Sequence, residues 1–322
     1  MSRRAVIIGI NEYESASISP LSGAVHDAEL MTDVLSKNED GSPNFECRQF
    51  TSPAQKVTRA LVKGECERLF ADGADAALFY FAGHGCPTTV GGFLVTWDGK
   101  DKDWGISMQE LLDHANSSRV KEVLFILDCC NSGNLGDPAS VQGAIENRAI
   151  LREGVTILAA CRSTQNAVEI GGQGMFTAMV LHALHGGAAD VMGLVSAASI
   201  YAHVDLALGA WDQRPIYKSY ASRLGPIRKC EPAVPLGILR ILPTIFVDPI
   251  GTLLLDPSYE VTNKTADPAK VAVFNNLKIY RNARLVRTTK DDDLYYAALN
   301  STGVRLTGLG RFYWHLAKNG RI

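Results

Sequence analysis

Residues 76–85 read Ala-Ala-Leu-Phe-Tyr-Phe-Ala-Gly-His-Gly, and residues 122–133 read Glu-Val-Leu-Phe-Ile-Leu-Asp-Cys-Cys-Asn-Ser-Gly. Each stretch is a continuous apolar run, which is typical of a strand buried on both faces of a parallel sheet. Each run ends at a turn that carries reactive side chains. Because the carboxyl ends of parallel strands meet at one edge of the sheet, we predict a functional site at that edge.

Strands and helices alternate around these two runs. This alternation predicts an α/β fold in which helices cover both faces of a mostly parallel sheet. The further strands are expected at 5–10, 45–50 and 155–161, and the helices at 24–36, 53–71, 107–114, 175–185 and 194–208.

The pattern changes after residues 228–235, which have the composition of a linker. Short strands at 271–274 and 277–280 and helices at 292–299 and 312–318 predict a small α/β domain that is similar in type to a winged helix. We therefore divide the chain into a large domain over residues 1–227 and a small C-terminal domain over residues 236–322, the latter with a regulatory or sensing role.

The composition is that of a globular protein, with 46% hydrophobic and 20% charged residues. The net charge of -2 favours neither nucleic acid nor membrane as the main partner. Seven cysteines without a CxxC pair indicate free thiols in a reducing compartment. The apolar stretch 236–255 is interrupted by charges and prolines, and no signal peptide is recognisable, so we expect a cytoplasmic protein.

His84 and Cys130 are the candidate reactive pair. Taken alone, each could have a purely structural role. His84 could simply occupy a tight turn, and Cys130 could be a buried structural thiol. Together, at the ends of two neighbouring strands, they can meet in space. The histidine would then take the proton of the thiol, and the thiolate would attack a carbonyl carbon.

The two motifs, Ala82-Gly83-His84-Gly85 and Asp128-Cys129-Cys130-Asn131-Ser132-Gly133, resemble the active-site motifs of metacaspases and other bacterial caspase-like proteases of peptidase clan CD. Further ordered matches extend over roughly residues 4–222. They include Gly9-Ile10-Asn11-Glu12-Tyr13, Gly23-Ala24-Val25-His26-Asp27, Gly174-Met175-Phe176-Thr177 and Gln213-Arg214-Pro215.

The resemblance implies a caspase-like fold and a cysteine endopeptidase. We assign it no required cofactor, and Ca²⁺ stays open as an alternative. It makes His84 the general base and Cys130 the nucleophile. The backbone amides of Gly85 and Cys130 would form the oxyanion hole, a role that agrees with free amides at a strand end.

The resemblance also places Asp27 and Asp128 in the primary specificity pocket. Two carboxylates favour protein or peptide substrates with Arg or Lys at the cleaved position, and argue against cleavage after Asp. The alternative for Asp27 is a charge that stabilises the first turn of a helix.

Two further expectations concern the loops. Some metacaspases need Ca²⁺, and Asp98, Asp101, Asp103 and Asp137 are loop carboxylates of a suitable type, although they lack a diagnostic spacing. Residues 134–153 occupy the place of an activation loop, where Arg148 or Arg152 could be a self-cleavage site.

Competing functions remain open at this point. The chain could be a catalytically silent caspase-like interaction module. Its tail could bind a nucleotide, a protein or, less in keeping with the overall charge, nucleic acid, because residues 235–322 hold twelve Lys and Arg against seven Asp and Glu. A sensing tail could also gate the protease, as in caspase-like antiphage enzymes that respond to a nucleotide made by a TIR partner. That last idea is an analogy with the family.

Overall fold

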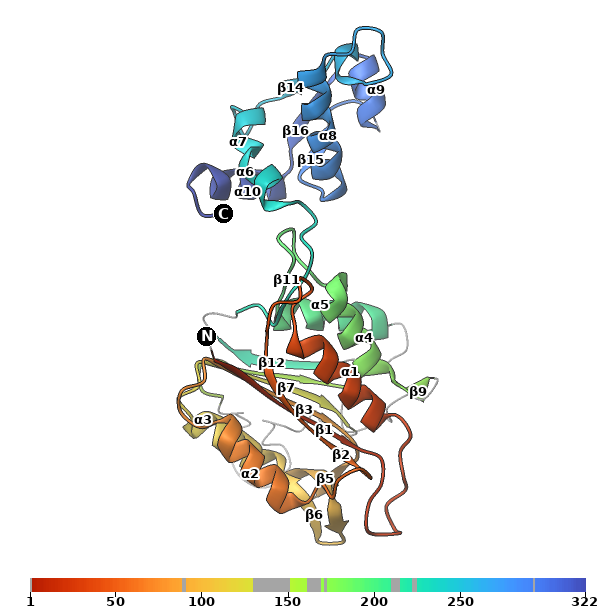
Figure 1. Cartoon of the computed structure of the whole chain (residues 1–322), viewed down its shortest axis with the longest axis vertical. Coiled ribbons are helices and arrows are strands. Elements are labelled where there is room, and N and C mark those ends of the chain that lie inside the picture. The colour runs from red at the N-terminus through yellow and green to blue at the C-terminus, as the bar shows by residue number, and fades with distance from the viewer. Residues whose placement is uncertain are drawn as a thin grey trace. The chain divides into compact units, whose positions relative to one another are not determined.

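The computed structural model describes residues 2–88, 91–129, 151–160, 169–170, 173–209, 215–221, 225–291 and 293–322. The chain divides into two units (Figure 1). The first unit comprises Met1–Ala189 and Leu194–Cys230, and the second comprises Asp190–Gly193 and Glu231–Ile322.

A six-stranded sheet forms the centre of the first unit, with the strand order β12-β8-β7-β3-β1-β2. All neighbouring strands are parallel except β12, which runs antiparallel to β8 at the edge. The strands are β1 (Arg3–Ile10), β2 (Glu46–Ser52), β3 (Ala76–Ala82), β7 (Glu122–Asp128), β8 (Val155–Ala159) and β12 (Ile216–Tyr220). The structure therefore confirms the predicted mostly parallel sheet.

Helices cover both faces of this sheet (Figure 1). Alternate residues of β1 enter two different cores, with Val6 and Ile8 in one and Ala5 and Ile7 in the other. This explains why the strands read as continuous apolar runs. The first core is closed by α2 (Arg59–Leu69) and α3 (Met108–Ser117). The second is closed by α1 (Ala24–Ser36), α4 (Met175–His182) and α5 (Ala197–Leu208).

Capping residues move two helix starts from their predicted positions. The helix expected from residue 53 begins at Arg59, because the side chain of Thr58 accepts a hydrogen bond from the amide of Leu61. The helix expected from residue 194 begins at Ala197, where Ser196 and Ser199 form a capping box. The helix expected to reach residue 185 ends in a π-helical turn, η3 (Ala183–Gly187).

Among the described residues of the first unit, three small sheets accompany the large one, and none of them was predicted. A hairpin sheet joins β4 (Gly85–Thr88), β5 (Gly91–Lys100) and β6 (Asp103–Ser107) directly after His84. Two-residue pairs join β9 (Glu169–Ile170) to β10 (Gln173–Gly174), and β11 (Leu194–Val195) to β13 (Arg228–Lys229).

The predicted linker at 228–235 is wrong in its first part. Arg228 is buried, and its guanidinium donates hydrogen bonds to the carbonyl oxygens of Lys37 and Leu184. Residues 228–230 therefore belong to the first unit, and the second unit resumes at Glu231.

The second unit packs helices against a three-stranded antiparallel sheet of order β14-β16-β15. Its elements are α6 (Leu236–Arg240), α7 (Leu242–Ile245), β14 (Leu253–Leu254), η5 (Pro257–Tyr259), α8 (Pro268–Asn282), β15 (Val286–Thr288), α9 (Leu294–Leu299), β16 (Gly303–Leu306) and α10 (Gly308–Lys318). The strands predicted at 271–274 and 277–280 are wrong, because both lie in α8. Asp267 caps that helix and Pro268 occupies its first turn, while Phe274, Leu277 and Tyr280 recur at helical spacing on its buried face.

No helix in the described parts of either unit combines the length and the apolar character needed to cross a membrane.

Candidate active site

His84 lies just beyond β3, at the carboxyl-end edge of the sheet. A Cβ atom at Gly83 would lie 2.9 Å from the ring of Phe81 and 3.2 Å from the Tyr13 hydroxyl, so the turn needs glycine. The amide of His84 donates a 2.9 Å hydrogen bond to the Tyr13 hydroxyl, and its carbonyl accepts one of the same length from the amide of Val95 in β5. The backbone of His84 is therefore held on both sides.

The imidazole of His84 is oriented by a backbone carbonyl. Its Nε2 lies 2.8 Å from the carbonyl oxygen of Ser19. Because a carbonyl oxygen can only accept a hydrogen bond, Nε2 carries a proton, and in the neutral imidazole it is Nδ1 that has the free electron pair. The half-buried ring thus has the tautomer that a general base needs.

The side chain of Tyr13 contacts both the backbone amide and the ring of His84. Its ring centroid lies 5.3 Å from that of His84, and its hydroxyl also contacts the carbonyl oxygen of Ile10 at 3.3 Å. Burial raises the pKa of the Tyr13 hydroxyl well above its usual value, so the group stays protonated. The sequence indicates Tyr13 only as a member of a motif, and its contact with His84 was not predicted.

The strand that leads to the other motif lies beside β3. In the parallel pairing of β3 with β7, Ala82 is opposite Asp128, and the amide of Gly83 donates a 3.3 Å hydrogen bond to the Asp128 carbonyl. The two strands therefore leave the sheet side by side at the same edge. Cys129 is buried, whereas Cys130, the predicted nucleophile, lies outside the described residues.

Asp27 and Asp128 converge on one residue, Gly174. Both are buried, with 2% and 8% of their surface exposed. Oδ2 of Asp27 accepts a 3.1 Å hydrogen bond from the amide of Gly174. A Cβ atom on Gly174 would lie 2.5 Å from Oδ2 of Asp128 and 3.1 Å from Oδ2 of Asp27, so only glycine fits between the two carboxylates.

Thr177, one turn into α4, fixes the second carboxylate. Its hydroxyl donates a 2.6 Å hydrogen bond to Oδ2 of Asp128, and its amide contacts the same oxygen at 3.3 Å. Since the Thr177 proton is used in this way, the Tyr80 hydroxyl, 2.8 Å away, donates to Thr177. Burial and then the charges of Asp128 and Asp27 raise the pKa of Tyr80, which keeps this chain of hydrogen bonds protonated.

The structure thus brings together the two carboxylates that the sequence analysis singled out. It adds Gly174, Thr177 and Tyr80, whose roles were not predicted. Two buried carboxylates this close repel each other, and a cation placed between them would relieve that repulsion.

The candidate Ca²⁺ ligands do not gather into a site in the part of the chain that the structure describes. Asp98 accepts hydrogen bonds from the amide of Arg59 and the hydroxyl of Thr96, and Asp103 forms an ion pair with Arg59. Among the described residues, no group of three or more His, Cys, Asp and Glu side chains could hold a metal ion. Asp137 lies outside those residues.

Arg152, a candidate self-cleavage site, is held by the end of α3. Its guanidinium donates hydrogen bonds to the carbonyl oxygens of Ala115 and Val120 and to the Ser118 hydroxyl. Its amide donates to the Asn116 side chain. Burial lowers the pKa of Arg152, and Arg148 lies outside the described residues.

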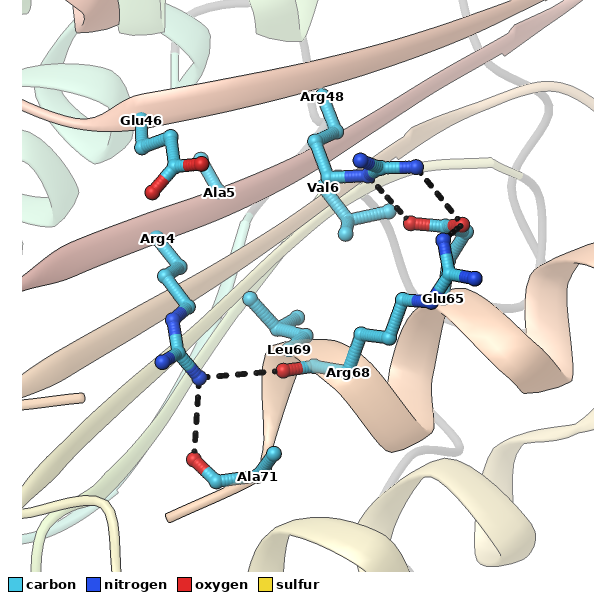
Figure 2. A pocket seen from close by; sticks show the side chains of 9 residues that line it. All are labelled: Arg4, Ala5, Val6, Glu46, Arg48, Glu65, Arg68, Leu69 and Ala71. Carbon is cyan, nitrogen blue, oxygen red and sulfur yellow. Dashed lines mark hydrogen bonds and ion pairs between the residues drawn. The ribbon is translucent and has the colours of Figure 1, made fainter. Parts of the chain in front are cut away.

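A cavity of about 300 Å³ lies at the other end of the sheet, beside the amino-terminal half of β1 (Figure 2). Figure 2 shows Arg48 and Arg68 both reaching Glu65, with ion-pair distances of 2.6 and 3.0 Å. Arg4 donates instead to the carbonyl oxygens of Arg68 and Ala71. The Arg48–Glu65 ion pair and the hydrogen bonds of Arg4 join α2 and the residues after it to the sheet.

Comparisons with known proteins agree on the nature of the first unit. The family model described as the caspase domain, Peptidase_C14, matches residues 2–223. A search of curated proteins found no match.

Two solved structures share the fold. GSU0716 of Geobacter sulfurreducens is 18% identical with a TM-score of 0.54, over 72% of this chain and 100% of its own. Caspase-1 of Spodoptera frugiperda is 14% identical with a TM-score of 0.50, over 70% of this chain and 90% of its own. At these identities the likeness shows the fold alone.

Proposed function

Because the chain belongs to the caspase domain family of cysteine peptidases, we propose that it is a cysteine endopeptidase that cleaves proteins after Arg or Lys. The observation that carries this proposal is the His84 site, where a histidine of fixed tautomer stands at the strand edge beside the strand that leads to Cys130.

In the proposed reaction Nδ1 of His84 takes the proton of the Cys130 thiol. The thiolate attacks the carbonyl carbon of the scissile bond, and a carbon–sulfur bond forms. His84 then gives the proton to the leaving amine, and water hydrolyses the thioester. The amides of Gly85 and Cys130 would stabilise the oxyanion, each such donor contributing roughly 100- to 1000-fold to turnover.

The preference for Arg or Lys rests on the carboxylates of Asp27 and Asp128. Both are buried, and Oδ2 of each lies next to Gly174. A guanidinium can bind two carboxylates with several charge-assisted hydrogen bonds, whereas an acidic substrate side chain would be repelled.

The test is hydrolysis of matched fluorogenic peptides that carry Arg, Lys or Asp at the cleaved position. We expect turnover of the Arg and Lys peptides, none of the Asp peptide, and loss of turnover in Cys130→Ala and in His84→Ala. Cleavage of the Asp peptide, or turnover that survives both substitutions, would reject the proposal. A folded wild-type protein without turnover under any condition would favour the silent interaction module.

Self-cleavage is part of the proposal, and the contacts of Arg152 make Arg148 the better site. Arg152 would have to give up its hydrogen bonds to α3 before it could enter a specificity pocket. Incubation of the wild-type chain should therefore yield fragments that end at Arg148, and Cys130→Ala should stay intact.

Gating through the C-terminal unit, activation by a nucleotide, and a role in antiphage defence also belong to the proposal. They rest on the family analogy given above. Adding nucleotides or Ca²⁺ to the peptide assay tests each of them, since a true activator must raise the rate of wild type and leave Cys130→Ala inactive.

A further inference from the structure

The cavity beside the amino-terminal half of β1 contains charged side chains that the fold does not balance. Its volume of about 300 Å³ is large enough for a small molecule. Residues of β1, β2 and α2 provide its walls (Figure 2). Its charged members are Arg4, Glu46, Arg48, Glu65 and Arg68. The partners of these five side chains decide what the cavity can bind.

Glu65 is the one carboxylate of the cavity whose charge is neutralised by the protein. It is 6% exposed, and it accepts hydrogen bonds of 2.6 and 3.1 Å from Arg48 and of 3.0 Å from Arg68. Because two guanidinium groups share this single carboxylate, the three side chains together carry a net positive charge. Each guanidinium has five N–H donors, so both arginines keep donors for a further acceptor.

Arg4 and Glu46 carry opposite charges on neighbouring strands without pairing. They lie opposite each other in the parallel pairing of β1 with β2, but no ion pair joins them (Figure 2). Nη1 of Arg4 donates instead to the carbonyl oxygens of Arg68 and Ala71. This leaves Nε and Nη2, the side-on pair of donors that binds a carboxylate with two parallel hydrogen bonds. The exposed side chain of Glu46 forms no hydrogen bond or ion pair with the residues that the structure describes.

These charges stand beside apolar side chains, since Val6 and Leu69 line the same cavity. A ligand that satisfies every group therefore needs a carboxylate, a cationic amine and an apolar body. A simple anion would lie beside the like charge of Glu46, and a simple cation would meet the surplus of guanidinium groups. An α-amino acid carries its ammonium and carboxylate groups on one carbon atom, and its side chain can supply the apolar body.

We propose that this cavity binds a free α-amino acid with an apolar side chain. Nε and Nη2 of Arg4 donate to its carboxylate, Glu46 accepts from its ammonium group, and its side chain packs against Val6 and Leu69. The cavity lies at the amino-terminal end of β1, whereas His84 follows the carboxyl end of the neighbouring strand β3. The inference therefore does not depend on the peptidase reaction.

The test is isothermal titration calorimetry of the full chain with L-leucine, in a Cys130→Ala background that prevents self-cleavage. We expect one site per chain with a Kd of roughly 0.01–1 mM, which is reasonable for a ligand of this size. Isocaproate is leucine without its ammonium group, and isoamylamine is leucine without its carboxylate. Each analogue should bind roughly tenfold or more weakly than leucine, because each lacks one set of charge-assisted hydrogen bonds.

Two substitutions assign the two ends of the ligand. Glu46→Gln should weaken leucine binding roughly tenfold or more without weakening that of isocaproate, and Arg4→Gln should do the same without weakening that of isoamylamine. Circular dichroism must show both variants folded, and Arg4→Lys, which keeps the charge but loses the side-on pair of donors, serves as a milder replacement. Arg59→Gln and Glu67→Gln, at exposed positions of α2 outside the cavity, are the matched controls and should leave leucine binding unchanged.

Three results would overturn the proposal. The first is the absence of leucine binding up to its solubility limit. The second is binding of isocaproate or isoamylamine as tight as that of leucine, which would make the cavity a site for plain anions or plain amines. The third is leucine binding that the substitutions of Glu46 and Arg4 leave intact, which would place the amino acid elsewhere on the chain.

Discussion

Replacing Asp27 by Asn tests whether charge in the Asp27–Asp128 pair sets the cleavage preference. The substitution removes one negative charge and keeps the shape, and the Asn carbonyl oxygen can still accept the 3.1 Å hydrogen bond from the amide of Gly174. Hydrogen bonds to charged groups contribute about 1.5–3 kcal/mol. We therefore expect kcat/KM for an Arg peptide to fall roughly 10- to 150-fold.

Citrulline, the uncharged isostere of Arg, isolates the electrostatic part. A peptide with citrulline at the cleaved position should be poor for the wild type and nearly unaffected by Asp27→Asn. The Arg-to-citrulline ratio of kcat/KM should then shrink by the same factor as the Arg rate. Glu29→Gln, an exposed residue of the same helix, is the matched control and should leave the ratio unchanged. If Asp27→Asn lowers both rates equally, the residue supports the fold rather than the cation, and the reasoning is refuted.

Three further predictions follow from single contacts. Tyr13→Phe leaves the His84 amide without its acceptor, which costs about 1–3 kcal/mol. We therefore expect kcat to fall about tenfold or more with little change in KM. An unchanged kcat would show that Tyr13 does not position His84. Gly174→Ala forces a Cβ within 2.5 Å of the Asp128 carboxylate and should lower the free energy of unfolding by about 1–3 kcal/mol and abolish Arg cleavage, which thermal denaturation and the peptide assay would measure. Nε2 of His203 lies 2.9 Å from Nδ1 of His182. Burial, and then the charge of His182, lower the pKa of His203 below 6.5. The unfolded chain therefore binds more protons than the folded one, and stability is lost as the pH falls below about 6.5. His203→Gln should therefore flatten the decrease in Tm between about pH 7 and pH 5, and an identical decrease in both proteins would contradict this assignment.

The sheet could be predicted from sequence because its strands are buried on both faces. The continuous run from Ala5 to Ile10 has no other simple interpretation, and it forms most of β1. The same criterion failed at 271–280, where short apolar groups looked like strands. There Asp267, Pro268 and the spacing of Phe274 and Leu277 favour a helix, and a capping analysis would have found it.

The site was only partly accessible to sequence reasoning. His84 follows from a strand that ends in Gly-His-Gly, but the pairing of Asp27 with Asp128 came from the family resemblance, because no spacing rule joins residues about a hundred positions apart. Gly174 and Tyr13 matter through close approaches in three dimensions. Gly174 leaves no room for a Cβ atom beside the two carboxylates, and the hydroxyl of Tyr13 accepts a hydrogen bond from the His84 amide. Neither contact leaves a local pattern in the sequence.

The most direct test of the central claim is covalent labelling with a peptidyl-Arg chloromethyl ketone, followed by intact and peptide mass spectrometry. The chain has seven cysteines, and burial raises the pKa of the Cys47 thiol to about 12 and raises that of Cys66 further, so these two should stay unreactive. We predict one adduct, on Cys130, that disappears in Cys130→Ala and is strongly slowed in His84→Ala. An adduct on Cys129 or another cysteine, or labelling at an unchanged rate without His84, would contradict the assignment of His84 and Cys130 as the catalytic pair.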